Sequence, residues 1–243
     1  MTRFPILVVV IAALTGPVGL AQGPSSEEVA RRQFESGQAF ARDGKFGEAL
    51  KDFKAVVEAH PNSAAADNAL LEIGRYYLDV VKDPGQALPV AEAILKKYPT
   101  SDSAPSAHVL VGRIALTRSR KRADLETALA SFERVPRLFP DSEAVPRALH
   151  MAGEALRLEK RYDEALERYR RVAIDYPRDP WSANAQIGAG MALQALGDPI
   201  GALEEMQRAR NSFPRAPEAA VVLGRVTTLY RLYVRGKGGP AFT

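Results

Sequence analysis

The sequence has no cysteine, few aromatic residues and no strong excess of either charge. Aromatic residues make up 7% of the 243 positions, and 33 basic residues face 29 acidic ones, a formal net charge of +4. The lack of cysteine excludes disulfides, cysteine-ligated metals and a thioether-linked lipid anchor, so stability has to come from packing. The mild charge does not indicate a nucleic-acid partner.

Long hydrophobic runs are also scarce, and the main one lies at the N-terminus. Arg3 precedes the apolar stretch 6–14, and small residues follow up to Ala21. This order predicts a signal peptide over 1–21, cleaved after Ala21, and therefore an exported, periplasmic or secreted protein. The apolar stretch would cover only about half of a roughly 30 Å hydrocarbon core, so no stable transmembrane anchor is expected after cleavage. A buried N-terminal helix and a retained anchor are the alternatives.

A pattern of proline, alanine and glycine recurs through the rest of the chain. Each repeat has an Ala-Leu pair whose alanine stands twelve residues before a proline, and a glycine stands thirteen residues after each of the first four prolines. The prolines are Pro61, Pro99, Pro140, Pro177 and Pro214, the alanines Ala49, Ala87, Ala128, Ala165 and Ala202, and the glycines Gly37, Gly74, Gly112, Gly153 and Gly190. All length variation falls between glycine and alanine, which places a turn there.

Each repeat therefore predicts helix A, a turn, helix B and a connection that begins at the proline. Proline keeps the preceding residue out of the helical region and so ends helix B. Asp83 and Asp198 stand where they can cap the start of a helix B, each followed by a proline at the first helical position. Prolines inside helix B, Pro89 and Pro136, predict kinks.

The recurring glycines need a packing reason. Glycine inside a helix costs about 1 kcal/mol relative to alanine, so five of them would weaken the helices considerably. Small side chains at the glycine and alanine positions would let helix A and helix B cross closely. We expect this close crossing in every repeat.

The pattern of glycine, alanine, a bulky residue four positions later and a closing proline resembles the tetratricopeptide repeat over nearly the whole chain after the signal. The resemblance implies an all-α, right-handed superhelix, an α-solenoid of about five helix-turn-helix units with a C-terminal capping helix. A short linker at 22–26 would precede the array at 27–235, and a flexible tail at 236–243, or a linker to a further domain, would follow. The expected units are about 27–61, 62–99, 100–140, 141–177 and 178–214, with the cap at 215–235.

Repeats of 37 to 41 residues, with Tyr-Pro or Phe-Pro followed by serine and alanine, resemble the tetratricopeptide proteins of the bacterial envelope. Among these are the periplasmic coordinator of the Tol-Pal system and the outer-membrane assembly lipoprotein D, whose lipid-bearing cysteine is absent here. The resemblance implies a non-catalytic scaffold that binds a protein or peptide partner, in envelope assembly or division.

No residues are spaced for catalysis, for a cofactor or for a metal. The three histidines, His60, His108 and His150, occupy unlike positions in their repeats, and the glycine-rich run 187–197 falls inside a predicted helix rather than after a strand. We therefore expect no enzyme activity, no cofactor and no metal site. Trp181, the only tryptophan, is expected to pack between adjacent units.

In a tetratricopeptide superhelix, helix A lines the concave groove, and residues one, four and five after the glycine face inward. The predicted groove residues are Gln38, Arg42, Arg75, Leu78, Asp79, Arg113, Leu116, Glu154, Arg157, Met191, Gln194, Thr228 and Arg231. Because arginine is frequent among them, we expect a peptide with carboxylates, held by bidentate arginine pairing. Three alternatives stay open: these arginines are merely solvated, the array is a spacer or oligomerisation module, or it binds an anionic cell-wall or membrane surface. The oligomeric state is also open.

Overall fold

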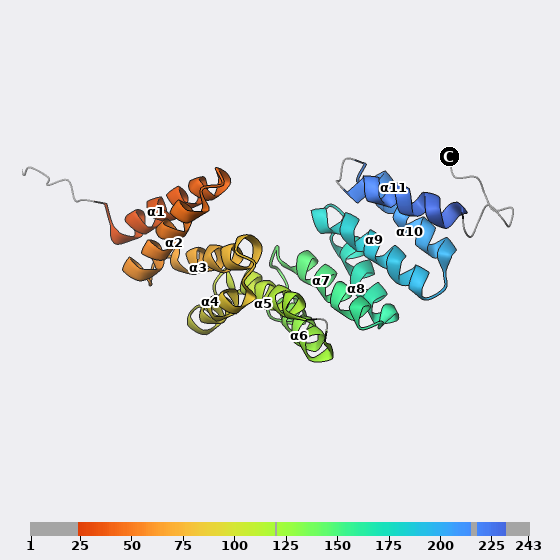
Figure 1. The fold of residues 1–243 in the computed structure, drawn as a ribbon, viewed down its shortest axis with the longest axis horizontal. Coiled ribbons are helices and arrows are strands. Elements are labelled where there is room, and N and C mark those ends of the chain that lie inside the picture. Colours follow the sequence, from red (N-terminus) through yellow and green to blue (C-terminus); the bar gives the residue numbers. More distant parts are fainter. Residues whose placement is uncertain (1–23, 120, 215–217, 232–243) are drawn as a thin grey trace, which may run out of the picture.

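The computed structural model describes residues 24–119, 121–214 and 218–231, with side chains left out for 218–223. The predicted signal peptide and tail lie outside these residues, as do parts of the predicted linker and cap. The described residues form eleven α-helices and one short π-helix and contain no strand (Figure 1). The all-α expectation is therefore confirmed.

The helices alternate between two equivalent sets along the chain. The A helices are α1 (Ser26–Arg42), α3 (Ala66–Arg75) with its π-helical extension η1 (Tyr76–Val80), α5 (Ala104–Arg118), α7 (Val145–Leu158) and α9 (Pro180–Ala195). The B helices are α2 (Phe46–Ala59), α4 (Pro84–Lys97), α6 (Arg122–Leu138), α8 (Tyr162–Asp175) and α10 (Pro199–Ser212). The last described helix is α11 (Glu218–Leu229), which packs on α10 and α9.

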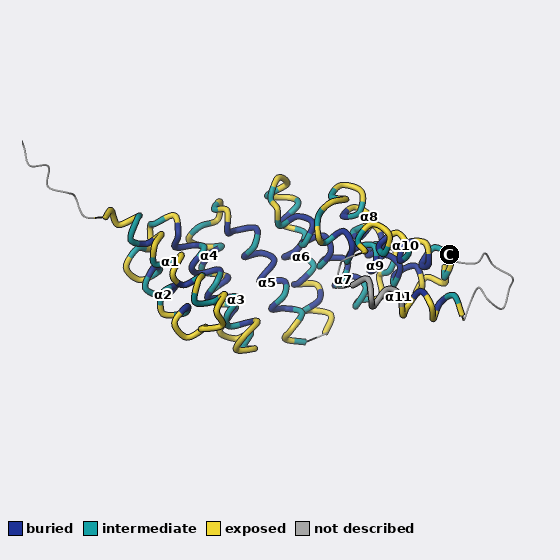
Figure 2. The backbone as a smooth tube through the Cα atoms, turned by 90° about the horizontal axis from the view of Figure 1, so that it is seen from above, coloured by how far each residue is buried: buried dark blue, intermediate teal, exposed yellow. Residues whose placement is uncertain are grey.

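Each helix packs on the next, and A helices of neighbouring units also touch, as α7 and α9 do. The result is an elongated array with α1 and α11 at opposite ends (Figure 1). Buried residues follow the contacts between successive helices, and exposed residues gather at the turns and outer faces (Figure 2). The core is therefore spread along the array in three successive clusters rather than gathered in one compact centre, as expected for a stacked repeat protein.

The closing prolines act as predicted. The residue before each proline leaves the helical region with nearly the same geometry, φ between −136° and −129° and ψ between 53° and 60°, at His60, Tyr98, Phe139, Tyr176 and Phe213. Tyr98 also ties two units together, because its hydroxyl donates to the carbonyl oxygen of Pro61 at 2.5 Å.

The starts of the B helices agree with the predicted caps. The carboxylate of Asp83 accepts from the backbone N–H of Gly85 at 2.9 Å, and that of Asp198 accepts from Gly201 at 2.8 Å. α4 and α6 continue through Pro89 and Pro136 to Lys97 and Leu138. In four units the turn between the two helices contains a left-handed residue, for example Lys160 in the fourth unit at φ 61° and Gly197 in the fifth at φ 85°.

The recurring glycine lies where helix B approaches most closely. A Cβ at Gly153 would come within 2.6 Å of the ring of Tyr169, and one at Gly37 within 2.7 Å of Phe53. The second unit differs, because its helix B has Ala91 in place of the bulky residue. There a Cβ at Gly74 would meet Leu110 of the next helix A at 2.7 Å. The glycine is therefore needed in this unit as well, but the contact comes from a neighbouring unit.

We predict that Gly153→Val lowers the urea midpoint of unfolding, with a loss of about 1–3 kcal/mol from overpacking against Tyr169. Gly47→Ala is the matched control, because Gly47 lies in α2 and a Cβ there meets no atom within 4 Å. That substitution should leave stability unchanged or raise it by up to about 1 kcal/mol through helix propensity. Equal midpoints for Gly153→Val and the wild type would show that close crossing does not explain the glycine.

Candidate partner-binding surface

The structure places the predicted groove residues in three environments. Leu78 is only 4% exposed and belongs to the core of the second and third units, so the prediction that it contacts a partner is wrong. The π-helical turn η1 carries Leu78 into that core and leaves Asp79 exposed. Half-buried are Gln38, Arg75, Arg113, Leu116, Glu154, Arg157 and Met191. Exposed are Arg42, Asp79, Gln194, Thr228 and Arg231.

One pair of predicted residues joins two units. The guanidinium of Arg113 in α5 donates to both carboxylate oxygens of Asp79 in η1, at 2.5 and 3.2 Å. This bidentate pair links the A helices of the second and third units. Its geometry is the one by which arginine recognises a carboxylate, here one supplied by the chain itself.

Two further arginines are paired within their own helices. Arg75 donates to Glu72 at 2.7 Å, and Arg157 donates to Glu154 at 2.6 Å. The hydroxyl of Tyr169 also donates to Glu154, at 2.5 Å. Burial raises the pKa of Glu154, but the hydrogen bonds from Arg157 and Tyr169 outweigh that effect and hold its pKa below the usual value. A partner carboxylate would have to compete with these internal acids.

The structure also points to Arg147 as a candidate binding residue. The rule that selects residues one, four and five after the glycine did not include it. It lies in α7, seven residues before Glu154, and two helical turns place both residues on the same face. Its guanidinium carbon is 5.4 Å from the ring centre of Trp181, while its Nε is buried and has no hydrogen-bond partner. Among the described residues Arg147 forms no ion pair. A rule that extended towards the start of helix A would have included it.

The charge around Arg147 is predominantly positive. Burial is the main cause that lowers the pKa of Arg147 to about 10, and the positive charges of Arg113 and Arg75 lower it further. The negative charge of Asp79 acts in the opposite direction and raises the pKa of Arg147. Arg147 therefore stands beside two arginines from preceding units, in a place where a carboxylate would be stabilised.

Two histidines are packed as core residues. The ring of His150 lies 5.6 Å from that of Tyr169 and 5.2 Å from that of Trp181. Trp181 thus packs against the preceding unit, as expected, and also touches Arg147. Burial lowers the pKa of His150 to about 4 and lowers the pKa of His108 as well.

Predicted groove residues line two separate hollows. Arg75 and Asp79 lie at one of about 130 Å³, whose apolar lining includes Phe46 and Val80. At the other end of the array, Gln194 and Thr228 lie at a hollow of about 270 Å³ between α9 and α11. Over residues 24–119, 121–214 and 218–231, no three acidic or histidine side chains are grouped to hold a metal ion. Within the same ranges no helix is long and apolar enough to cross a membrane.

Paired helices, glycine-mediated crossings and closing prolines define a tetratricopeptide-repeat protein. In agreement with this, a tetratricopeptide-repeat profile matches residues 147–179. The profile of the YfiO family, described as an outer membrane lipoprotein, matches residues 26–152, slightly more than half of the chain. The chain therefore belongs to the YfiO family, although none of its 243 residues is a cysteine that could carry a lipid.

Solved structures show the same fold. TTC0263, a tetratricopeptide protein of Thermus thermophilus, has a TM-score of 0.62 and 15% identity, covering 84% of this chain and all of its own. PilW, a type IV pilus biogenesis factor, has a TM-score of 0.63 and 16% identity, with coverage of 80% and 82%. MamA has a TM-score of 0.58 and 19% identity, with coverage of 79% and 95%. No curated protein matches the sequence.

The buried histidines predict a pH-dependent stability. The folded pKa of His150, about 4, lies below the value of about 6.5 expected for the unfolded chain. Below pH 6.5 the unfolded state therefore binds a proton that the folded state does not, and stability falls as the pH drops towards 4. This group alone would cost about 2 kcal/mol by pH 5.

We expect urea midpoints measured from pH 7 to pH 5 to fall less steeply for His150→Phe than for the wild type. Phenylalanine keeps an aromatic ring between Tyr169 and Trp181 but cannot be protonated. His108→Phe should remove a further share of the slope. An unchanged slope in His150→Phe would mean that His150 is not held neutral by burial.

Proposed function

We propose that this protein is a non-catalytic protein-protein interaction scaffold of the bacterial cell envelope. Its A helices would bind an extended or helical segment of a partner that carries carboxylates, in envelope assembly or division. Membership of a family described as outer membrane lipoproteins and the predicted signal peptide support an envelope location. The repeat fold supports binding of another protein, since stacked repeats present long continuous surfaces.

The observation that carries the proposal is Arg147, a half-buried residue that forms no ion pair with any described residue. Its Nε is buried without a hydrogen-bond partner, which is costly unless a bound molecule supplies an acceptor. Arg113 and Arg75 add positive charge beside it, and the ring of Trp181 lies 5.4 Å away. A carboxylate from a bound segment would satisfy Arg147, and the aromatic face would contact the rest of the incoming side chain.

The paired arginines would have a second role. Arg113 is held by Asp79 and Arg157 by Glu154, so neither offers a free charge. Their side chains are therefore fixed in place and can orient a bound segment, whereas the preference for an acidic segment would come from Arg147.

The test begins with crosslinking in the native envelope and identification of the partner by mass spectrometry. Affinity for that partner is then measured with the wild type, Arg147→Gln and Arg122→Gln. We expect Arg147→Gln to weaken binding roughly 30-fold or more, because one member of a desolvated charge pair is removed. Arg122, whose side chain is 87% exposed on α6, is the matched control and should bind as the wild type does.

Two results would contradict the proposal. One is equal affinity of Arg147→Gln and the wild type, with circular dichroism showing that both are folded. The other is self-association that occupies the same surface, seen as a mass that rises with concentration in light scattering and is abolished by Arg147→Gln. That second result would favour the oligomerisation alternative.

A further inference from the structure

A cleft between the B helices of the third and fourth units has no part in the proposed peptide site. Its volume is about 570 Å³, within the usual range for a small-ligand site. It is lined from α6 by Ala130, Glu133, Arg134, Pro136 and Arg137, from α7 by Leu149, and from α8 by Arg168 and Arg171. Four arginines and one glutamate thus surround it.

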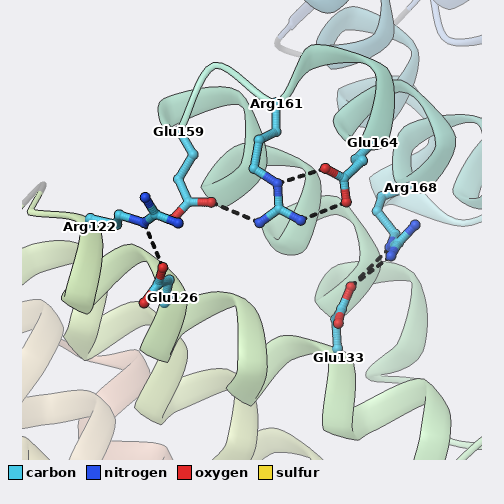
Figure 3. Close-up of polar contacts among 7 residues, drawn as sticks. All are labelled: Arg122, Glu126, Glu133, Glu159, Arg161, Glu164 and Arg168. Atoms are coloured by element: carbon cyan, nitrogen blue, oxygen red, sulfur yellow. Dashed lines mark hydrogen bonds and ion pairs between the residues drawn. The ribbon is translucent and has the colours of Figure 1, made fainter.

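Acidic side chains of the described residues pair with only two of these four arginines, Arg168 and Arg171. Arg168 in α8 donates to Glu133 in α6 at 2.8 Å and so bridges the two helices (Figure 3). Arg171 lies 3.3 Å from Asp175, with both side chains about half exposed. Arg134 and Arg137 are exposed and form no ion pair with any described residue. The cleft therefore keeps two exposed guanidinium groups without internal partners.

The same two units show how arginines are matched elsewhere. Near the start of α8, Arg161 contacts Glu159 at 3.0 Å and Glu164 at 2.6 Å, while Arg122 pairs with Glu126 at 2.7 Å (Figure 3). In that network acids outnumber arginines. The excess of positive charge in the cleft is thus a local property, and it favours an anionic ligand.

Apolar side chains next to the arginines narrow the choice of ligand. Leu138 follows Arg137 directly and is 53% exposed, and Ile174 lies one turn after Arg171 and is 74% exposed. Both lie in the last turn of their helices, and α6 and α8 are equivalent helices of successive units, so these turns lie on the same side of the array. Arginines beside exposed aliphatic residues fit the boundary between lipid head groups and acyl chains.

We propose that this cleft binds the phosphate of an anionic lipid head group, with Leu138 and Ile174 in contact with the interfacial layer of the membrane. The site lies on B helices, whereas the proposed peptide site lies on A helices. A scaffold docked in this way could hold a membrane surface and a partner at the same time. The lipid site does not depend on the proposed peptide binding.

The test measures binding of the full chain to vesicles of phosphatidylcholine alone and of phosphatidylcholine with phosphatidylglycerol. Binding to neutral vesicles reports any contribution of the apolar N-terminal stretch, so the difference between the two vesicles isolates the charge-dependent part. At low salt each arginine near an anionic surface strengthens binding roughly fivefold. Arg134→Gln/Arg137→Gln should therefore weaken the charge-dependent part about 30-fold, and added salt should weaken it in the wild type.

The controls separate the cleft from general charge. Arg122→Gln removes an exposed arginine of the same helix outside the cleft and should retain most of the binding. Leu138→Ser/Ile174→Ser should weaken binding while keeping the salt dependence. An equal loss in Arg122→Gln and the double arginine variant would overturn the proposal. So would binding of inorganic phosphate, or of an acidic peptide, without any preference for anionic vesicles.

Discussion

The structure depends on the close approach of helix B to a glycine of helix A. In four units a large side chain, such as Tyr169 against Gly153, occupies the space that a Cβ would need. This contact sets how closely the two helices of a unit cross. Because A helices of neighbouring units also pack on one another, the next unit stacks in the same way. In the second unit, where Ala91 replaces the large residue, Leu110 of the following helix fills the space. The crossing is thus preserved by a contact between units.

This arrangement separates the two kinds of charged surface. A helices bring Arg75, Arg113 and Arg147 from three successive units near one another, because equivalent faces of these helices are stacked. B helices bring Arg134 and Arg168 from two units to one cleft. Neither group is close in sequence. Each surface therefore exists only through the stacking of the units.

The internal acids decide which arginines are available. Asp79, Glu72 and Glu154 neutralise the arginines that the sequence made most conspicuous, whereas Arg147 has no acidic partner among the described residues. A guanidinium that is already paired with an acid can orient a bound ligand. An unpaired guanidinium can in addition form a new ion pair with the ligand and so strengthen binding. For this reason the number of arginines on a face is a poor guide to the site, and their pairing is a better one.

The sequence by itself determined the helices, their order and their ends. The intervals from glycine to alanine to proline reflect local backbone limits, such as the exclusion of the residue before proline from the helical region, which hold whatever the neighbours do. The tertiary structure alone decided which of the predicted groove side chains are buried, paired or exposed. Leu78 is buried because a π-helical turn shifts the face of the helix, and Arg147 is unpaired because no described acid reaches it. Both outcomes depend on neighbours from other units, which spacing along one helix cannot specify.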